Sequence, residues 1–161
     1  REHRIRFLEM YFNDTMCNLG QINRDKNLHW LKERLTINEH LGFKFILCIE
    51  GNDVASNLKW VMSSNSLAVM PKPKFETWFM EGMLIPNYHY VQIKDDYSDL
   101  KERLTYYIQN TNEALQIIKN ANNYINQFRD KKREDIISLL VLEKYFYRTD
   151  QRKPLNTSLY D

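Results

Sequence analysis

The sequence predicts an α/β fold in which a short parallel sheet is followed by three C-terminal helices. Three short apolar runs are typical of buried strands: residues 43–50, bounded by Gly; residues 66–70, closed by Pro71 and Pro73; and residues 89–93, which start at His89. Between the first two runs, and after the third, apolar residues recur at helical spacing. The order strand–helix–strand–loop–strand and then helices favours parallel strands joined by crossover connections.

Composition limits the class of protein. The 161 residues, 43% of them hydrophobic and 27% charged, are enough for one domain with a core. The 23 Lys and Arg residues are nearly cancelled by 21 Asp and Glu, and no basic stripe is present, which argues against nucleic-acid binding. No apolar run approaches the roughly 20 residues of a membrane span, and no signal peptide is visible. Cys17 and Cys48 have no metal-like or framework spacing, so we expect a reducing cytoplasm.

The first half of the chain gives two helical signals. Residues 1–35 show no pattern that predicts a definite element. Thr36 and Glu39 match a capping box, which predicts a short helix that ends near Gly42. A second helix is predicted over residues 54–62, where one face carries Val54, Leu58, Val61 and Met62.

From Ser98 onward the pattern is helical. Ser98 is the predicted N-cap of the first of the three helices, and Asn110 with Glu113 resembles a second cap. The most regular apolar face in the chain follows: Ala114, Ile117, Ala121, Tyr124, Ile125 and Phe128. A third helix is predicted over 132–147. We expect one domain over residues 1–149 and a polar tail over 150–161.

The tight polar corner after the first strand is the main candidate site. Ligands of open α/β sheets bind beyond the carboxyl ends of the strands, where helix N-termini supply free N–H groups. Gly51 would allow close approach of a ligand or a positive φ, and Asn52, Asp53 and Ser56 offer hydrogen bonds. The alternative is an ordinary turn in which Asp53 caps the helix.

Other candidates have ordinary structural explanations beside the functional ones. Lys72 and Lys74 could face a phosphate, and Trp78 or Phe79 could stack on a base or sugar. The alternative is a solvated loop with one aromatic anchor. His89 lies at a strand mouth, where a packed, hydrogen-bonded histidine is more common than a catalytic one. We find no nucleophile–base pair and no metal-ligand spacing, so no metal or other cofactor is expected and the catalytic residues stay unknown.

Three segments together resemble glycosyltransferase family 90, which includes lipopolysaccharide and capsule sugar transferases and Rumi-type O-glucosyltransferases. They are "FKFILCIEGNDVASNLKWVMSSNSLAVMP", "ETWFMEGMLIPNYHYVQIKDDYSDL" and "EALQIIKNANNYINQF", in that order. The resemblance covers residues 36–149 and is nearest to bacterial lipopolysaccharide biosynthesis members. It implies the Rossmann-like C-terminal half of a GT-B enzyme, the half that binds the nucleotide-sugar donor.

The resemblance also implies roles for particular residues. Gly51, Asn52 and Ser56 would lie at the donor diphosphate, with Asp53 beside them. Relatives commonly carry an Arg six residues after this Gly, where this chain has Asn57. Lys59 or Lys72 would then supply the charge, and His89 would contact the donor or support the strand mouth. The general base of such enzymes lies in the N-terminal half, for which we find no counterpart here.

The expected function is transfer of a hexose from a nucleotide sugar, with uridine as the expected nucleotide, to a lipopolysaccharide or related glycan. The alternative is a non-catalytic, truncated transferase module that binds a partner. The expected partners are the sugar donor and a glycan or lipid-linked acceptor, with peripheral association at the inner face of a bacterial inner membrane. Because the chain begins with Arg1 and its first residues resemble mid-domain sequence, we expect it to be part of a longer polypeptide.

Overall fold

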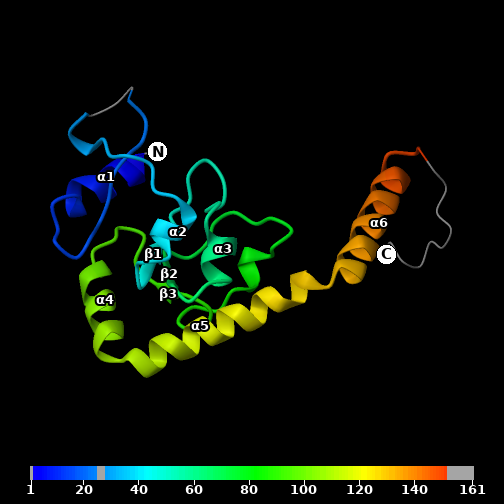
Figure 1. The fold of residues 1–161 in the computed structure, drawn as a ribbon. Helices are drawn as coiled ribbons and strands as arrows, with labels where there is room; N and C mark the ends of the chain where they lie inside the picture. The colour runs from blue at the N-terminus through cyan, green and yellow to red at the C-terminus, as the bar shows by residue number, and fades with distance from the viewer. Residues whose placement is uncertain (1, 25–27, 152–161) are drawn as a thin grey trace. The chain divides into compact units, whose positions relative to one another are not determined.

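The computed structural model describes residues 2–24 and 28–151 (Figure 1). This part of the chain divides into two compact units, one ending at Ile125 and one starting at Asn126. The single domain over residues 1–149 stays a prediction. Most of the predicted tail over 150–161 lies outside the described residues. The elements are α1 Glu2–Tyr11, η1 Leu28–Trp30, α2 Ile37–His40, β1 Phe45–Leu47, α3 Leu58–Met62, β2 Leu67–Met70, η2 Glu81–Met83, β3 Val91–Gln92, α4 Leu100–Gln109, α5 Thr111–Asn126, η3 Gln127–Arg129 and α6 Lys131–Arg148.

The three predicted strands form a parallel sheet in the order β1-β2-β3, which confirms the mixed α/β class. Phe45 pairs with Leu67, and Val69 pairs with Val91. Each strand is shorter than its apolar run. β2 ends at Met70, directly before Pro71, and Pro73 comes two residues later. Proline cannot donate to a strand ladder, so these residues prevent the strand from continuing.

Both faces of the sheet are covered, as a parallel sheet requires. On one face, apolar side chains of all three strands form a core cluster with residues of α1, α4 and α5. The buried members are Phe7, Tyr11, Leu67, Val69, Val91, Ile93, Tyr97, Leu100, Leu104, Tyr107, Ala114 and Ile117. α3 packs against β2 and buries Leu58, Val61 and Met62. Figure 1 shows α3 and α4 on opposite sides of the sheet.

The predicted helix boundaries need several corrections. α1 was not predicted at all; it buries only Phe7 and Tyr11, so its apolar stripe is too thin to give a periodic signal. The helix predicted to start at residue 54 begins at Leu58, because residues 51–57 form bends and turns. The capping box is confirmed: Thr36 accepts the Glu39 N–H, and Glu39 accepts the Thr36 N–H.

The caps of the later helices also differ from the prediction. Asp99, not Ser98, occupies the N-cap position of α4, and the Ser98 hydroxyl donates to Asp96 instead. Asn110 ends α4 by donating its side-chain amide to the Tyr106 carbonyl. The predicted apolar face of α5 is confirmed in part, since Ala114, Ile117, Ala121 and Ile125 are buried.

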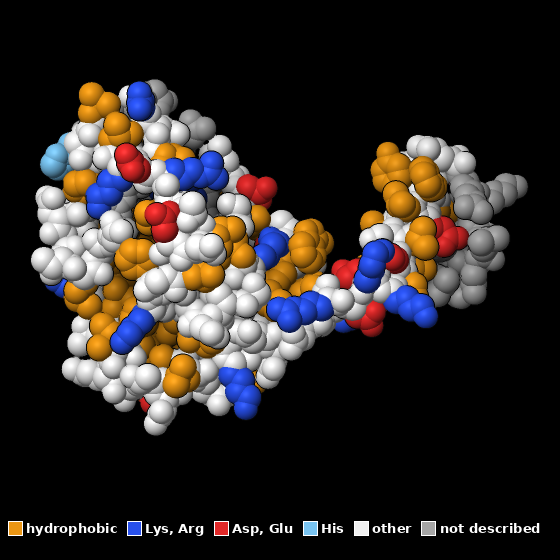
Figure 2. Space-filling model, viewed as in Figure 1, with side chains coloured by type: hydrophobic (Ala, Val, Ile, Leu, Met, Phe, Trp, Pro, Cys, Tyr) orange, Lys and Arg blue, Asp and Glu red, His pale blue; other side chains and the backbone are white. Residues whose placement is uncertain are grey.

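The second unit contains η3 and α6. α6 buries none of its side chains, although it carries a run of large apolar residues. The exposed ones are Ile136, Ile137, Leu139, Leu140, Val141, Leu142 and Tyr145. Figure 2 shows hydrophobic side chains at the surface of this helix. Within the described ranges, no helix combines the length and the apolar character needed to span a membrane.

Candidate functional site

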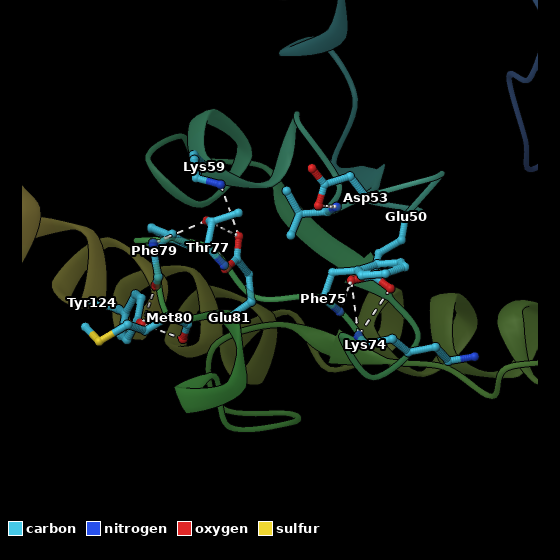
Figure 3. A network of polar contacts seen from close by, with 11 residues as sticks. Glu50, Asp53, Lys59, Lys74, Phe75, Thr77, Phe79, Met80, Glu81 and Tyr124 are labelled. Atoms are coloured by element: carbon cyan, nitrogen blue, oxygen red, sulfur yellow. Dashed lines mark hydrogen bonds and ion pairs between the residues drawn. The ribbon is translucent and has the colours of Figure 1, made fainter. Parts of the chain in front are cut away.

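The segments that follow the three strands meet at the carboxyl edge of the sheet. The Glu50 carboxylate accepts the backbone N–H groups of Lys74 and Phe75, at 3.1 and 3.2 Å from Oε1 (Figure 3). The Lys74 ammonium in turn lies 2.9 Å from the Asp95 carboxylate. Glu50 and Lys74 therefore join the loops after β1, β2 and β3. This is the edge at which open α/β sheets bind ligands.

Residues 50–57, here named the Gly51 corner, are contacted by the N-terminal helix. Arg4 donates from Nε to the Glu50 carbonyl at 2.9 Å and from Nη2 to the Ile49 carbonyl at 2.6 Å. His3 donates from Nε2 to the same Glu50 carbonyl at 2.9 Å. Carbonyls of the segment just after β1 are thus satisfied by side chains from α1, more than 40 residues earlier in the sequence.

Gly51 makes room for this contact. Its φ does not lie in the left-handed region, so conformational freedom is not why glycine is needed. A Cβ built at this position would lie 3.3 Å from Arg4 Cζ and 3.3 Å from Arg4 Nη2. The close approach predicted for a ligand is therefore made by the Arg4 guanidinium.

The other predicted residues of the Gly51 corner lie at its surface. Asn52, Asp53 and Ser56 are exposed. Asp53 accepts the N–H of Val54 at 2.8 Å and caps no helix. Asn57 is half-buried and donates its side-chain amide to the Leu47 carbonyl at 2.8 Å, which ties the corner to β1. These four side chains lie together at the Gly51 corner, and ligand binding by them stays a prediction.

The predicted lysines lie in different surroundings. The Lys59 ammonium is 3.1 Å from Glu81 Oε1 and lies over the rings of Trp78 and Phe79, 5.6 and 5.1 Å from their centroids. Lys72 is exposed, and no ion pair to it is found within residues 2–24 and 28–151. Lys59 is therefore already paired, whereas the charge of Lys72 is open to solvent.

Glu81 is the center of a closed polar group, here named the Glu81 cluster, that consists of Lys59, Thr77 and Glu81 (Figure 3). The carboxylate is 1% exposed and accepts the Thr77 N–H at 2.7 Å and the Thr77 hydroxyl at 2.9 Å. Burial opposes ionisation of Glu81, but the hydrogen bonds from Thr77 and Lys59 outweigh burial and lower the pKa of the carboxyl. The cluster therefore holds a buried, ionised and fully bonded carboxylate.

A row of aromatic rings continues from this cluster. Phe79 packs edge-on against Tyr124 at 5.3 Å, and Tyr124 lies 5.1 Å from the His89 ring. The Tyr124 hydroxyl donates to the carbonyls of Phe79 and Met80, which holds Met80 at its unusual φ of 53°. Trp78, at one end of the row, leaves 65% of its surface exposed.

His89 is built into this row. Its Nδ1 accepts the N–H of Ile85 at 3.0 Å, and its own backbone N–H donates to the Ile85 carbonyl at 2.9 Å. The side chain is 9% exposed, and burial lowers the pKa of the ring. In this geometry His89 supports the turn before β3, which is one of the two roles predicted for it.

The sequence pattern did not single out Arg4, His3, Glu50 or Glu81. Arg4 and His3 lie on a helix with no periodic signal, and their partners are carbonyls far along the chain. Glu50 was predicted to end the first strand, and Glu81 lies in a segment for which no helix or strand was predicted. Within the described residues, no group of three or more His, Cys, Asp or Glu side chains could hold a metal ion.

The comparison with protein families identifies the family of this chain. The sequence model of "Glycosyl transferase family 90" matches residues 4–146, nearly the whole described chain. The chain belongs to glycosyl transferase family 90. The match extends the resemblance, first seen from residue 36, back to α1, so the helix that carries Arg4 is part of the family 90 region.

A curated relative agrees with this assignment. The chain is 44% identical over 147 residues to O-glucosyltransferase LpsA of Dichelobacter nodosus. The matched region is 91% of this chain and 46% of that protein. This family 90 chain therefore spans about half the length of the relative it matches.

Proposed function

We propose that this family 90 chain is the donor-binding part of a hexosyltransferase with GT-B architecture. It takes a nucleotide-linked hexose, with uridine diphosphate as the leaving group, and the acceptor is a lipopolysaccharide or related glycan. The name of the relative, an O-glucosyltransferase, supports hexose transfer. In this proposal the chain works at the inner face of a bacterial inner membrane, where a lipid-linked acceptor is reached by peripheral association.

The observation that supports the donor role is the arrangement at the carboxyl edge of the sheet. Three loops converge there, held together through Glu50 and Lys74, and the edge carries the exposed polar side chains of Asn52, Asp53 and Ser56. A nucleoside diphosphate binds by hydrogen bonds and positive charge, both of which this edge supplies. Lys72 adds an exposed cation directly after β2.

The chemistry of donor use follows from the same charges. When the acceptor hydroxyl loses its proton and its oxygen bonds to the sugar, the bond between the sugar and the diphosphate breaks and negative charge develops on the leaving diphosphate. Cationic side chains placed in advance at that position stabilise this charge more than the charge of the bound donor. In the proposed site, side chains of the carboxyl edge do this, and no protein-bound metal is required.

Thermal unfolding with nucleotides tests the proposal. A ligand that binds only the folded state stabilises it by about 2.7 kcal/mol at a hundredfold excess over Kd. For a chain of this size that raises the melting temperature by roughly 5–10 °C. We expect uridine diphosphate to do so and uridine, which lacks the phosphates, to have little effect. A flat titration to millimolar uridine diphosphate with folded protein would reject the donor role and favour the non-catalytic module.

A further inference from the structure

The Arg4 guanidinium is oriented by neutral groups at the Gly51 corner. Its Nε and Nη2 donate to the carbonyls of Glu50 and Ile49, and the flat group lies over Gly51. Two hydrogen bonds to neighbouring carbonyls of the segment just after β1 define both the position and the plane of the guanidinium. A side chain of four rotatable bonds is thus held in one arrangement before any ligand arrives.

The charge and most of the donors of Arg4 remain available. A guanidinium has five N–H donors, so three are left after the two bonds to carbonyls. Arg4 is exposed, and no carboxylate lies within 4 Å of it in the part of the chain that the structure describes. By contrast, Lys59 is paired with Glu81 and Lys74 with Asp95.

We propose that Arg4 is the residue that contacts the diphosphate of the donor, with Gly51 conserving the space in which its guanidinium lies. This inference rests on the proposed donor role of the carboxyl edge. A guanidinium presents paired N–H groups that match two oxygens of a phosphate, which an ammonium cannot do. Arg4 then supplies, from α1, the cation that the family resemblance placed six residues after Gly51, where this chain has Asn57.

A purely structural role for Arg4 is the competing explanation, because its bonds also fasten α1 to the end of β1. The two roles differ in what a substitution changes. If Arg4 only holds α1 in place, its substitution lowers the melting temperature and does not change the affinity for a nucleotide. If Arg4 contacts the phosphates, its substitution lowers the affinity for every probe that contains a diphosphate.

The test measures binding of uridine diphosphate, and separately of inorganic pyrophosphate, by calorimetry with the full chain and three variants. Arg4→Gln removes the charge and most of the donors, and Arg4→Lys keeps the charge without the paired donors. Arg6→Gln is the matched control, since Arg6 is an exposed arginine on the same helix with no hydrogen bond to the corner. Melting temperatures are recorded for all of them.

We expect Arg4→Gln to weaken uridine diphosphate binding about ten- to a hundredfold, as loss of a charge-assisted hydrogen-bond pair predicts. Arg4→Lys should fall between Arg4→Gln and the parent, and Arg6→Gln should stay near the parent. The pyrophosphate response should follow the same order.

If the parent binds and Arg4→Gln has the same affinity as Arg6→Gln, Arg4 has only a structural role. The proposed function is not affected by that result. A parent that binds neither probe would reject the proposed function as well. If Arg4→Gln does not fold, Arg4→Lys decides, and an affinity equal to that of the parent overturns the proposal.

Discussion

The Glu81 cluster and the Gly51 corner hold their charged groups in opposite ways. In the Glu81 cluster a carboxylate is 1% exposed and bonded to Thr77 and to the Lys59 ammonium. In the Gly51 corner the Arg4 guanidinium is exposed and bonded only to carbonyls. A buried pair has little left to offer a ligand, whereas an oriented but unpaired cation keeps its charge. The comparison thus distinguishes a structural ion pair from a candidate binding group.

Breaking the buried pair should have the largest effect on stability. Lys59→Met leaves Glu81 ionised and buried without its cation, which should cost about 3 kcal/mol. The double variant Lys59→Met/Glu81→Leu should recover much of that loss, because it removes both charges. Denaturant unfolding of the parent, both single variants and the double variant measures the coupling.

Lys74→Met is the matched control for this cycle. It breaks the exposed pair with Asp95, in which both side chains are more than 60% exposed, and should barely change the unfolding midpoint. If Lys59→Met and Lys74→Met lose the same stability, burial does not distinguish the two pairs.

The Gly51 corner should respond to added volume more than to lost polarity. Gly51→Val forces the Arg4 guanidinium away from the Ile49 and Glu50 carbonyls, at a cost of about 1 kcal/mol since the guanidinium is exposed. Nucleotide binding should fall much more, as the guanidinium loses its orientation. Calorimetry with uridine diphosphate beside a melting curve separates the two effects. Unchanged affinity in Gly51→Val would mean that the space above this residue is not part of a site.

A pH dependence should come from the aromatic row and not from the Gly51 corner. Burial lowers the folded-state pKa of His89, so its contribution to stability is complete above the unfolded value of about 6.5 and is lost as the pH falls toward the lowered value. His89→Asn keeps an acceptor for the Ile85 N–H but does not titrate. Its melting temperature should therefore fall less between pH 7 and pH 5.

His29→Asn is the control for this titration, because His29 is an exposed histidine. It also replaces one imidazole with an amide, but outside the aromatic row. If the melting temperatures of His89→Asn and the parent fall by the same amount between pH 7 and pH 5, another group causes the loss of stability in acid.

The smallest effects should come from the exposed polar residues of the corner. Asn52→Ala and Ser56→Ala remove side chains that lie at the surface, so neither should shift the melting temperature measurably. If they touch the donor, each should weaken uridine diphosphate binding a few-fold, through loss of one neutral hydrogen bond. If both variants bind uridine diphosphate as tightly as the parent, only the charged residues of the corner contact the donor.

Local pattern and long-range contacts explain what the sequence could predict. The strands were found because buried parallel strands are continuous apolar runs, and α5 was found because its buried residues repeat every turn. The Gly51 corner was located because it ends such a run. Arg4 could not be found this way, since its importance depends on two carbonyls that lie 45 and 46 residues further along the chain.

The Glu81 cluster shows the same limit. A lysine and a glutamate 22 residues apart carry no local sign of a pair. Lys59 was therefore interpreted as a free cation, whereas the fold brings it to a buried carboxylate. Residue type predicted a positive charge near the edge, and the three-dimensional arrangement shows that Lys59 is paired while Arg4 and Lys72, among the described residues, have no ion pair.

The docking of α1 has a consequence for the order of folding. Its anchors are distant in sequence: Arg4 contacts the strand end 46 residues away, and the Tyr11 hydroxyl donates to the Tyr97 carbonyl 86 residues away. Contacts of such separation require closure of long loops, so they form slowly and late. α1 buries only two side chains, so it can also open without unfolding the sheet. Amide hydrogen exchange should then be faster in α1 than in β2, and the Gly51 corner should exist complete only in the fraction of molecules in which α1 is docked.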